Sequence, residues 1–306
     1  MFTKVHEVAK QLNQVIIGKP LQIQQALVCL LAGGHLLIED LPGVGKTTLA
    51  QALAKSLGLA FNRVQFTSDL LPTDIIGVSI FEREKNQFIF HPGPIFTQVL
   101  LADEINRATP KTQSALLEAM EEHQVSAEGE TRPLPQPFFV IATQNPSHQV
   151  GTFALPESQL DRFLMCISLG YPDAAAERAL LAGEDRRHLI KTMQAAMQAQ
   201  EMCDIQTAIR KIHVSDALIH YVQQLAQASR NNQHFIEGMS PRAAIALLQA
   251  AKAWAALEGR DHVLPEDVQA VLIPVVAHRL RPRQSPNVKT LTSAELLTQI
   301  MQAIKV

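Results

Sequence analysis

The sequence predicts an α/β fold with a parallel sheet, followed by an all-α region. Three observations predict it. An apolar run at 36–38 leads through a Gly-rich turn into the helical pattern of 46–57, which makes a strand–turn–helix unit. The segment 98–104 is a second continuous apolar run, typical of a buried parallel strand. Strand patterns end after residue 172, so we expect two domains, 1–172 and 173–306.

Composition limits the class of protein. The 306 residues are 47% hydrophobic and 18% charged, as in a globular protein with a sizeable core. The formal charge is −2 and no Lys/Arg run occurs, so we expect no nucleic-acid partner. Three widely spaced cysteines fit a reducing compartment, and no apolar run is long enough to span a membrane. We therefore expect a cytoplasmic protein.

The turn between the first strand and its helix has the composition of a phosphate-binding loop. Its glycines let backbone N–H groups converge on an anion, and the N-terminus of the helix adds a favourable field. Lys46 would reach the β- and γ-phosphates of ATP, and the Thr47 hydroxyl would help to hold Mg²⁺. The nucleotide contacts that we expect come from Pro42, Gly43, Val44, Gly45, Lys46, Thr47 and Thr48.

Asp40 departs from the strict phosphate-loop pattern, which has glycine at this position. A carboxylate beside phosphates would repel them, so we expect the Asp40 side chain to point away from the nucleotide. The alternative is an ordinary Gly-rich turn with a surface lysine. A matching acidic strand downstream favours the phosphate loop.

The segment 98–104 supplies that strand, because its apolar run ends in two acids. Ligands of doubly wound sheets bind at the carboxyl ends of the strands. Asp103 would act through Mg²⁺, and Glu104 would orient and polarise the attacking water. The alternative is a strand that ends in two solvated acids.

A further buried strand, 138–145, also ends in polar residues. A side chain there, between the acidic strand and the phosphate loop, would be placed to sense the γ-phosphate. We expect Asn145 to do so, with Thr143 and Gln144 as alternatives. Asn before Pro is otherwise a common turn former.

The segment ahead of the phosphate loop predicts two helices, at 3–14 and about 20–32. The apolar turn between them contains Ile17 and Gly18. These residues would either pack on an adenine ring or belong to the core, and the sequence favours neither.

The remaining pattern predicts two hairpins, at about 79–91 and 124–137, which interrupt the strand–helix alternation. Ser215 and Ser240 are expected N-caps of helices in the second region. Further strands are expected at 61–66 and 164–169, and helices at 110–122, 173–183, 188–202, 215–230, 241–258, 265–280 and about 293–304.

Several motifs in a fixed order resemble the MoxR group of AAA+ ATPases. The resemblance covers about 14–170 strongly. It depends on Gly93-Pro94-Ile95-Phe96, Leu101 through Ala108, Gln113 through Met120, Ala142 through Pro146, and Leu155-Pro156 with Gln159 through Phe163. The runs Ser240-Pro241-Arg242-Ala243 and His278-Arg279-Leu280 extend it into the helical half.

The resemblance implies an AAA+ P-loop NTPase core with a parallel sheet, followed by an all-α lid domain. It also implies a Mg²⁺-dependent ATPase that forms a homo-oligomeric ring, often a hexamer, with ATP between neighbours. Arg162 matches the arginine finger that reaches the adjacent subunit's γ-phosphate, and Arg242 matches the sensor-2 arginine of the lid. The two hairpins match inserts that contact the substrate.

The group resembles chaperone-like ATPases that activate or assemble other proteins, often with a von Willebrand factor A-domain partner. We therefore expect a protein client. Three alternatives stay open on the sequence: a DNA-dependent motor, a metal-chelatase motor subunit, and a non-hydrolysing scaffold that ATP gates.

Overall fold

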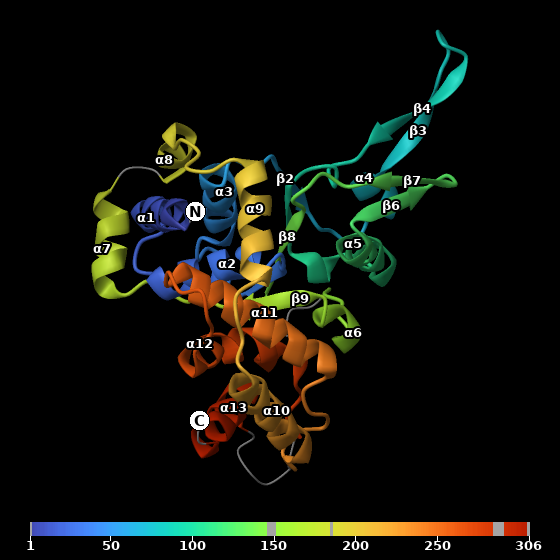
Figure 1. The fold of residues 1–306 in the computed structure, drawn as a ribbon. Helices are drawn as coiled ribbons and strands as arrows, with labels where there is room; N and C mark the ends of the chain where they lie inside the picture. Colours follow the sequence, from blue (N-terminus) through green and yellow to red (C-terminus); the bar gives the residue numbers. More distant parts are fainter. Residues whose placement is uncertain (1, 146–150, 184–185, 284–290, 305–306) are drawn as a thin grey trace.

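The computed structural model describes residues 2–145, 151–183, 186–283 and 291–304. Its centre is a five-stranded sheet in the order β2-β5-β8-β1-β9, and each neighbouring pair is parallel (Figure 1). The strands of this sheet are β1 (His35–Glu39), β2 (Phe61–Gln65), β5 (Val99–Asp103), β8 (Phe139–Gln144) and β9 (Phe163–Ile167). The predicted fold class, a parallel α/β sheet followed by helices, is confirmed.

The sheet is buried on both faces, which explains its continuous apolar strands. Alternate residues of one strand enter different cores because side chains alternate across a sheet. Leu36 and Ile38 pack with the helices before and after β1, whereas Leu37 packs with the helix that follows β5. The helices of the first region are α1 (Thr3–Val15), α2 (Pro20–Leu31), α3 (Lys46–Ser56), α4 (Pro72–Ile76), η1 (Ile105–Arg107), α5 (Pro110–Glu122) and α6 (Glu157–Leu160).

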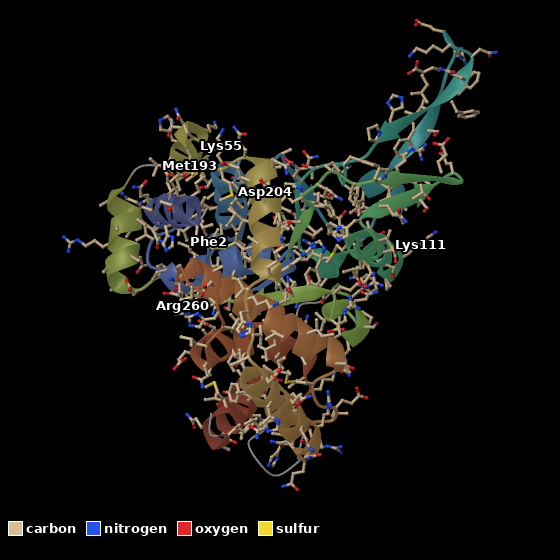
Figure 2. All side chains as sticks on the ribbon, viewed as in Figure 1. Phe2, Lys55, Lys111, Met193, Asp204 and Arg260 are labelled. Atoms are coloured by element: carbon tan, nitrogen blue, oxygen red, sulfur yellow. The ribbon has the colours of Figure 1, made fainter. Side chains whose placement is uncertain are left out.

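Two antiparallel hairpins form where the sequence predicted them, at about 79–91 and 124–137. One consists of β3 (Gly77–Glu82) and β4 (Gln87–Pro92), the other of β6 (Gln124–Ala127) and β7 (Glu130–Pro133). The β3–β4 hairpin extends well away from the rest of the molecule (Figure 1). Toward the tip of this hairpin, its side chains therefore project into solvent (Figure 2).

The expected single helix over 188–202 is wrong. The chain instead forms α8 (Arg186–Thr192) and α9 (Ala199–Arg210), joined by a non-helical segment. The amide of Ala196 in that segment donates to the carbonyl of Ser56 at the end of α3, and the buried Met197 packs in the core. This tertiary contact interrupts the helical pattern. Helix α8 consequently packs against α3. Figure 2 labels Lys55, in the last turn of α3, and Met193, which directly follows α8.

The last part of the chain is helical, as expected. Ser215 and Ser240 cap their helices by accepting from the amides of Leu218 and Ala243. Helix α11 packs on both α2 and α12, so the helical region and the sheet domain share one large core. The helices are α7 (Ala174–Ala182), α10 (Asp216–Asn231), α11 (Pro241–Leu257), α12 (Pro265–Val276), η2 (Ala277–Arg279) and α13 (Ser293–Ala303).

The domain boundary between residues 172 and 173 stays a prediction. None of the described helices is long and apolar enough to cross a membrane.

Candidate functional site

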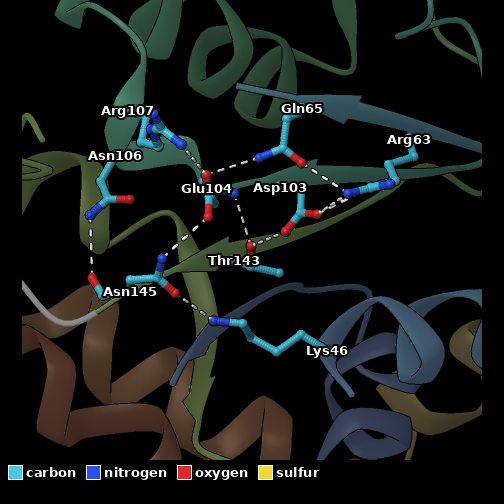
Figure 3. A network of polar contacts seen from close by, with 9 residues as sticks. All are labelled: Lys46, Arg63, Gln65, Asp103, Glu104, Asn106, Arg107, Thr143 and Asn145. Atoms are coloured by element: carbon cyan, nitrogen blue, oxygen red, sulfur yellow. Dashed lines mark hydrogen bonds and ion pairs between the residues drawn. The ribbon is translucent and has the colours of Figure 1, made fainter. Parts of the chain in front are cut away.

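The polar ends of three neighbouring strands meet at the carboxyl edge of the sheet. Strand β8 lies between β1 and β5. Asn145, which follows β8, is therefore placed between Lys46, which follows the turn after β1, and Glu104, which follows β5 (Figure 3). The sequence predicted that these three side chains would be close, and the structure brings them together.

The turn after β1 has the shape of an anion-binding loop. Gly43 and Gly45 adopt φ of +87° and +96°, in the left-handed region that favours glycine. A Cβ atom added to either glycine would meet nothing within 4 Å, so the backbone faces open space. Helix α3 starts directly afterwards at Lys46, and its first amides are free to bind an anion. This geometry fits the phosphates of a nucleotide.

Lys46 lies at the centre of the site and is only 8% exposed. Its Nζ donates to the carbonyl of Asp40 at 2.6 Å and to Oδ1 of Asn145 at 3.0 Å. Burial lowers the pKa of the Lys46 ammonium below its ordinary value, although the nearby carboxylates of Asp40, Asp103 and Glu104 oppose the shift. The ammonium is thus held by acceptors that a phosphate oxygen would replace.

Asp40 points away from the loop, as its position beside phosphates requires. Its Oδ2 accepts from the Ser168 hydroxyl at 2.9 Å and from the Gly170 amide at 2.6 Å, and its Oδ1 accepts from the Leu41 amide at 2.8 Å. Burial would raise the pKa of the Asp40 carboxyl, but these hydrogen bonds outweigh it and the pKa lies below its ordinary value. Asp40 therefore ties the loop to the segment after β9.

Asn145 connects the phosphate loop with the acidic strand. Its Oδ1 accepts from Lys46, and its Nδ2 donates to Oε1 of Glu104 at 3.3 Å (Figure 3). The two alternatives have other partners: Thr143 is fully buried and donates to Asp103 at 2.5 Å, and Gln144 donates to Glu39 at 3.0 Å. Of the three, Asn145 contacts the side chains of both Lys46 and Glu104, and its role as the γ-phosphate sensor stays a prediction.

Glu104 has a left-handed backbone, with φ of +56°, which is uncommon for a residue other than glycine. Two donors hold its Oε2: Nε2 of Gln65 at 3.0 Å and Nη1 of Arg107 at 2.9 Å (Figure 3). Strained backbone of this kind often occurs at functional sites. The carboxylate is therefore fixed at the edge of the site and faces Asn145.

The Asp103 carboxylate accepts hydrogen bonds from Arg63, a residue that the sequence analysis missed. Nε and Nη2 of Arg63 donate to its Oδ2 at 3.1 and 2.7 Å, and Thr143 holds its Oδ1. Arg63 and Gln65 lie on β2, which pairs with β5. The polar residues at alternate positions of 61–65 were the available signal, since they mark one face of that strand.

The other expected nucleotide contacts lie in two places, at the start of α3 and before α2. Thr47 and Thr48 line a cavity of about 660 Å³ together with Arg63. Ile17 and Gly18 lie just before α2, and Gly18 lies so close to Ala176 of α7 that a Cβ there would clash with its side chain. Whether Ile17 and Gly18 contact an adenine ring stays a prediction.

Arg162 and Arg242 lie at the opposite edge of the sheet. Arg162 directly precedes β9, whose first residue pairs with His35 at the start of β1, whereas Lys46 follows the end of β1. A strand of five residues separates the two edges by about 16 Å. The structure therefore places these arginines with each other and not with Lys46 of the same chain.

The fold and the family comparisons together define an ATPase of the AAA class. The family model described as "ATPase family associated with various cellular activities (AAA)" matches residues 35–165, and the model of an AAA lid domain matches residues 227–300. A crystal structure from Cytophaga hutchinsonii, described as a presumed ATPase, superposes with a TM-score of 0.89 and 36% identity, covering 99% of this chain and 95% of that one.

Relatives specify the family. Chaperone MoxR1 of Mycobacterium tuberculosis is 40% identical and covers 88% of this chain and 74% of its own. Protein MoxR of Paracoccus denitrificans is 37% identical over 92% of this chain and 91% of that protein. Protein YeaC of Bacillus subtilis, which is uncharacterized, is 42% identical over 97% of this chain and 93% of that protein. The chain belongs to the MoxR family of AAA+ ATPases.

Proposed function

We propose that this ATPase couples ATP binding and hydrolysis to chaperone-like remodelling, activation or assembly of other proteins. The observation that carries the proposal is the line of side chains from Lys46 through Asn145 to Glu104. Lys46 binds the phosphates, Glu104 orients the attacking water, and Asn145 between them reports the γ-phosphate to both. A relative named Chaperone MoxR1 supports the remodelling role.

Hydrolysis would depend on Mg²⁺, held by the Thr47 hydroxyl and the Asp103 carboxylate. The oxygen donors of both side chains suit this hard cation. When bound, Mg²⁺ neutralises charge on the β- and γ-phosphates. The Arg63 guanidinium, which now contacts Asp103, would have to give up that carboxylate oxygen to the ion.

Each site would be completed by a neighbouring copy of the chain in a ring, which we expect to be a hexamer. Arg162 and Arg242 lie together at the edge of the sheet opposite their own Lys46. An arginine supplied in trans raises the rate of phosphoryl transfer by about 10³–10⁵ in related systems. The ring would therefore hydrolyse ATP at its subunit boundaries.

A protein is the client that the exposed hairpin fits best. Ile80, Phe81 and Phe88 of the β3–β4 hairpin are 51%, 46% and 73% exposed. The tip carries balanced charge, with Lys85 paired to Glu82 at 2.9 Å. A DNA-binding hairpin would instead need a surplus of cations for phosphates. A von Willebrand factor A-domain protein would bring the client, and the complex would act in the cytoplasm.

The proposal is tested with Glu104→Gln, which should bind ATP without hydrolysing it and so retain its client. Co-purification with the variant in the presence of ATP, compared with Lys46→Ala, should recover a protein. Recovery of the same proteins with both variants would contradict ATP-dependent capture. Strong, salt-sensitive stimulation of hydrolysis by DNA would point to a DNA motor instead.

A further inference from the structure

Arg162 and Arg242 come from different parts of the fold and meet on one carboxylate. Nη2 of Arg242 donates to Oε2 of Glu121 at 2.6 Å, and Nε of Arg162 lies 3.9 Å from the same oxygen. Glu121 is on α5, Arg162 lies before β9, and Arg242 is in the first turn of α11. Two guanidinium groups repel each other, and a carboxylate that contacts both of them offsets this repulsion.

A second acid, Asp161, links Arg242 to a third arginine, Arg279. Oδ2 of Asp161 lies 3.6 Å from Nε of Arg242, and its Oδ1 lies 2.9 Å from Nε of Arg279. The Arg279 side chain is only 6% exposed and also donates to the carbonyl of Phe163 at 2.8 Å. Glu121, Asp161 and the three arginines all line one cavity of about 250 Å³.

Arg162 also has a second contact with α5. Its Nη1 donates to the carbonyl of Leu117, one turn before Glu121. Hydrogen bonding from Arg242 holds the pKa of the Glu121 carboxyl below its ordinary value, and so the group is ionised at neutral pH. Helix α5 thus supplies the groups that hold both arginines, the Glu121 carboxylate and the Leu117 carbonyl.

The other end of α5 is tied to the hydrolysis site. Gln113 in its second turn is fully buried, and its Nε2 donates to the carbonyls of Ile105 and Ala108 at 3.2 and 3.1 Å. Asn106, two residues after Glu104, donates to the carbonyl of Asn145 at 3.3 Å. A helix of 13 residues is about 20 Å long, which spans the sheet from one edge to the other.

We propose that Glu121 is a positioning residue that holds Arg162 and Arg242 as one pair for delivery to the neighbouring subunit's nucleotide. The inference rests on the proposed function, because it needs Arg162 and Arg242 to act on a neighbouring subunit's nucleotide. Glu121 itself takes no part in the chemistry. Helix α5 makes the position of the pair depend on the state of the site that contains Glu104 and Asn145. The carboxylate thereby links one subunit's nucleotide to hydrolysis in the next.

The test is Glu121→Gln, which removes the charge and keeps the size of the side chain. We expect kcat for ATP to fall about tenfold with KM changed less than about twofold, since small displacements of catalytic groups cost this much or more. Glu122→Gln is the matched control. Glu122 is the next residue on α5, is exposed, and has no ion pair within the described ranges. Removal of its charge should therefore leave kcat unchanged.

A double-mutant cycle separates positioning from a general loss of structure. In an Arg242→Ala background the further effect of Glu121→Gln should shrink to about twofold, because its main partner is gone. An undiminished tenfold effect there, or a wild-type kcat for Glu121→Gln alone, would overturn the inference. Should Glu121→Gln fail to fold, Glu121→Asp enters the same cycle, with a smaller loss expected from its shorter carboxylate. Failure of the proposed function itself would appear separately, as wild-type turnover in Arg162→Ala.

Discussion

The Oδ1 atom of Asn145 lies 3.0 Å from Nζ of Lys46, across the boundary between two neighbouring strands of the sheet. The amide nitrogen of the same side chain reaches Glu104. One amide group therefore contacts both the lysine proposed to bind phosphate and the acid proposed to direct water.

Removing this amide should slow hydrolysis far more than it weakens binding. Asn145→Ala leaves Lys46 and the loop backbone in place but removes the amide that donates to Oε1 of Glu104. We expect kcat to fall about 10²-fold, comparable to the loss of one preorganised donor, with nucleotide affinity changed little. Steady-state ATPase kinetics and a direct nucleotide-binding titration measure the two effects. Gln144→Ala is the control, since that side chain contacts Glu39, and equal losses in both variants would refute the assignment.

Neutralising Glu104 should stop turnover without preventing binding. Glu104→Gln retains the hydrogen-bonding shape of the side chain but cannot polarise water, so we expect kcat to fall by about 10²- to 10⁴-fold. Lys46→Ala should lose nucleotide binding as well. Binding titrations and phosphate-release assays distinguish the two variants. Wild-type turnover in both would show that the active site lies elsewhere.

Arg63 should compete with magnesium for Asp103. Arg63→Ala frees Oδ2 of the carboxylate, and because partly exposed ion pairs are worth at most about 1 kcal/mol, the Mg²⁺ concentration that half-saturates nucleotide binding should fall about two- to fivefold. Titration of Mg²⁺ against a bound fluorescent nucleotide gives this value. Lys55→Ala removes a cation from the same cavity without touching Asp103 and should change it less. A higher Mg²⁺ requirement in Arg63→Ala would mean that Arg63 assists the metal.

His35 should make the protein less stable in acid. Its Nδ1 accepts from the Val140 amide at 2.9 Å, which leaves the proton on Nε2 for the carbonyl of Met120 at 3.1 Å. Burial lowers the pKa of the neutral ring from 6.5 to about 4, against the opposing hydrogen bond to Met120. Between these two values the unfolded chain binds more protons, so the free energy of unfolding decreases as the pH falls.

The expected loss from His35 is about 3 kcal/mol between pH 6.5 and pH 4, at about 1.4 kcal/mol per pH unit. Urea unfolding across this range measures it. His35→Gln should give a shallower dependence on pH, whereas His234→Gln, at an exposed position, should follow the wild type. Parallel curves for His35→Gln and the wild type would contradict a buried neutral imidazole.

Local patterns predicted most of the fold and the centre of the site. The phosphate loop, Asp103, Glu104 and Asn145 each stand at the end of an apolar run, and parallel strands must bring such ends to one edge. Asp40 was the departure from pattern, and its hydrogen bonds to Ser168 and Gly170 explain why it is accommodated.

The residues that sequence reasoning missed are those whose partners depend on tertiary structure. Arg63 and Gln65 reach Asp103 and Glu104 only because β2 lies beside β5. The spacing of residues along the sequence does not predict the order of strands in the sheet. Glu121 is an ordinary helix acid until α11 brings Arg242 to it. The break between α8 and α9 likewise depends on a distant carbonyl, although the Glu201 carboxylate accepts from the Gln198 amide at 3.0 Å, a local contact that marks the new helix start.

The central claim is that one nucleotide is held by Lys46 of one subunit and triggered by Arg162 of the next. Mixing Lys46→Ala chains, which retain the arginine, with Arg162→Ala chains, which retain the phosphate loop, tests it most directly. Each variant alone should hydrolyse ATP negligibly, and the mixed assembly should recover activity at the boundaries that pair an intact loop with an intact arginine. No recovery in verified mixed assemblies, or full activity of Arg162→Ala alone, would contradict the account.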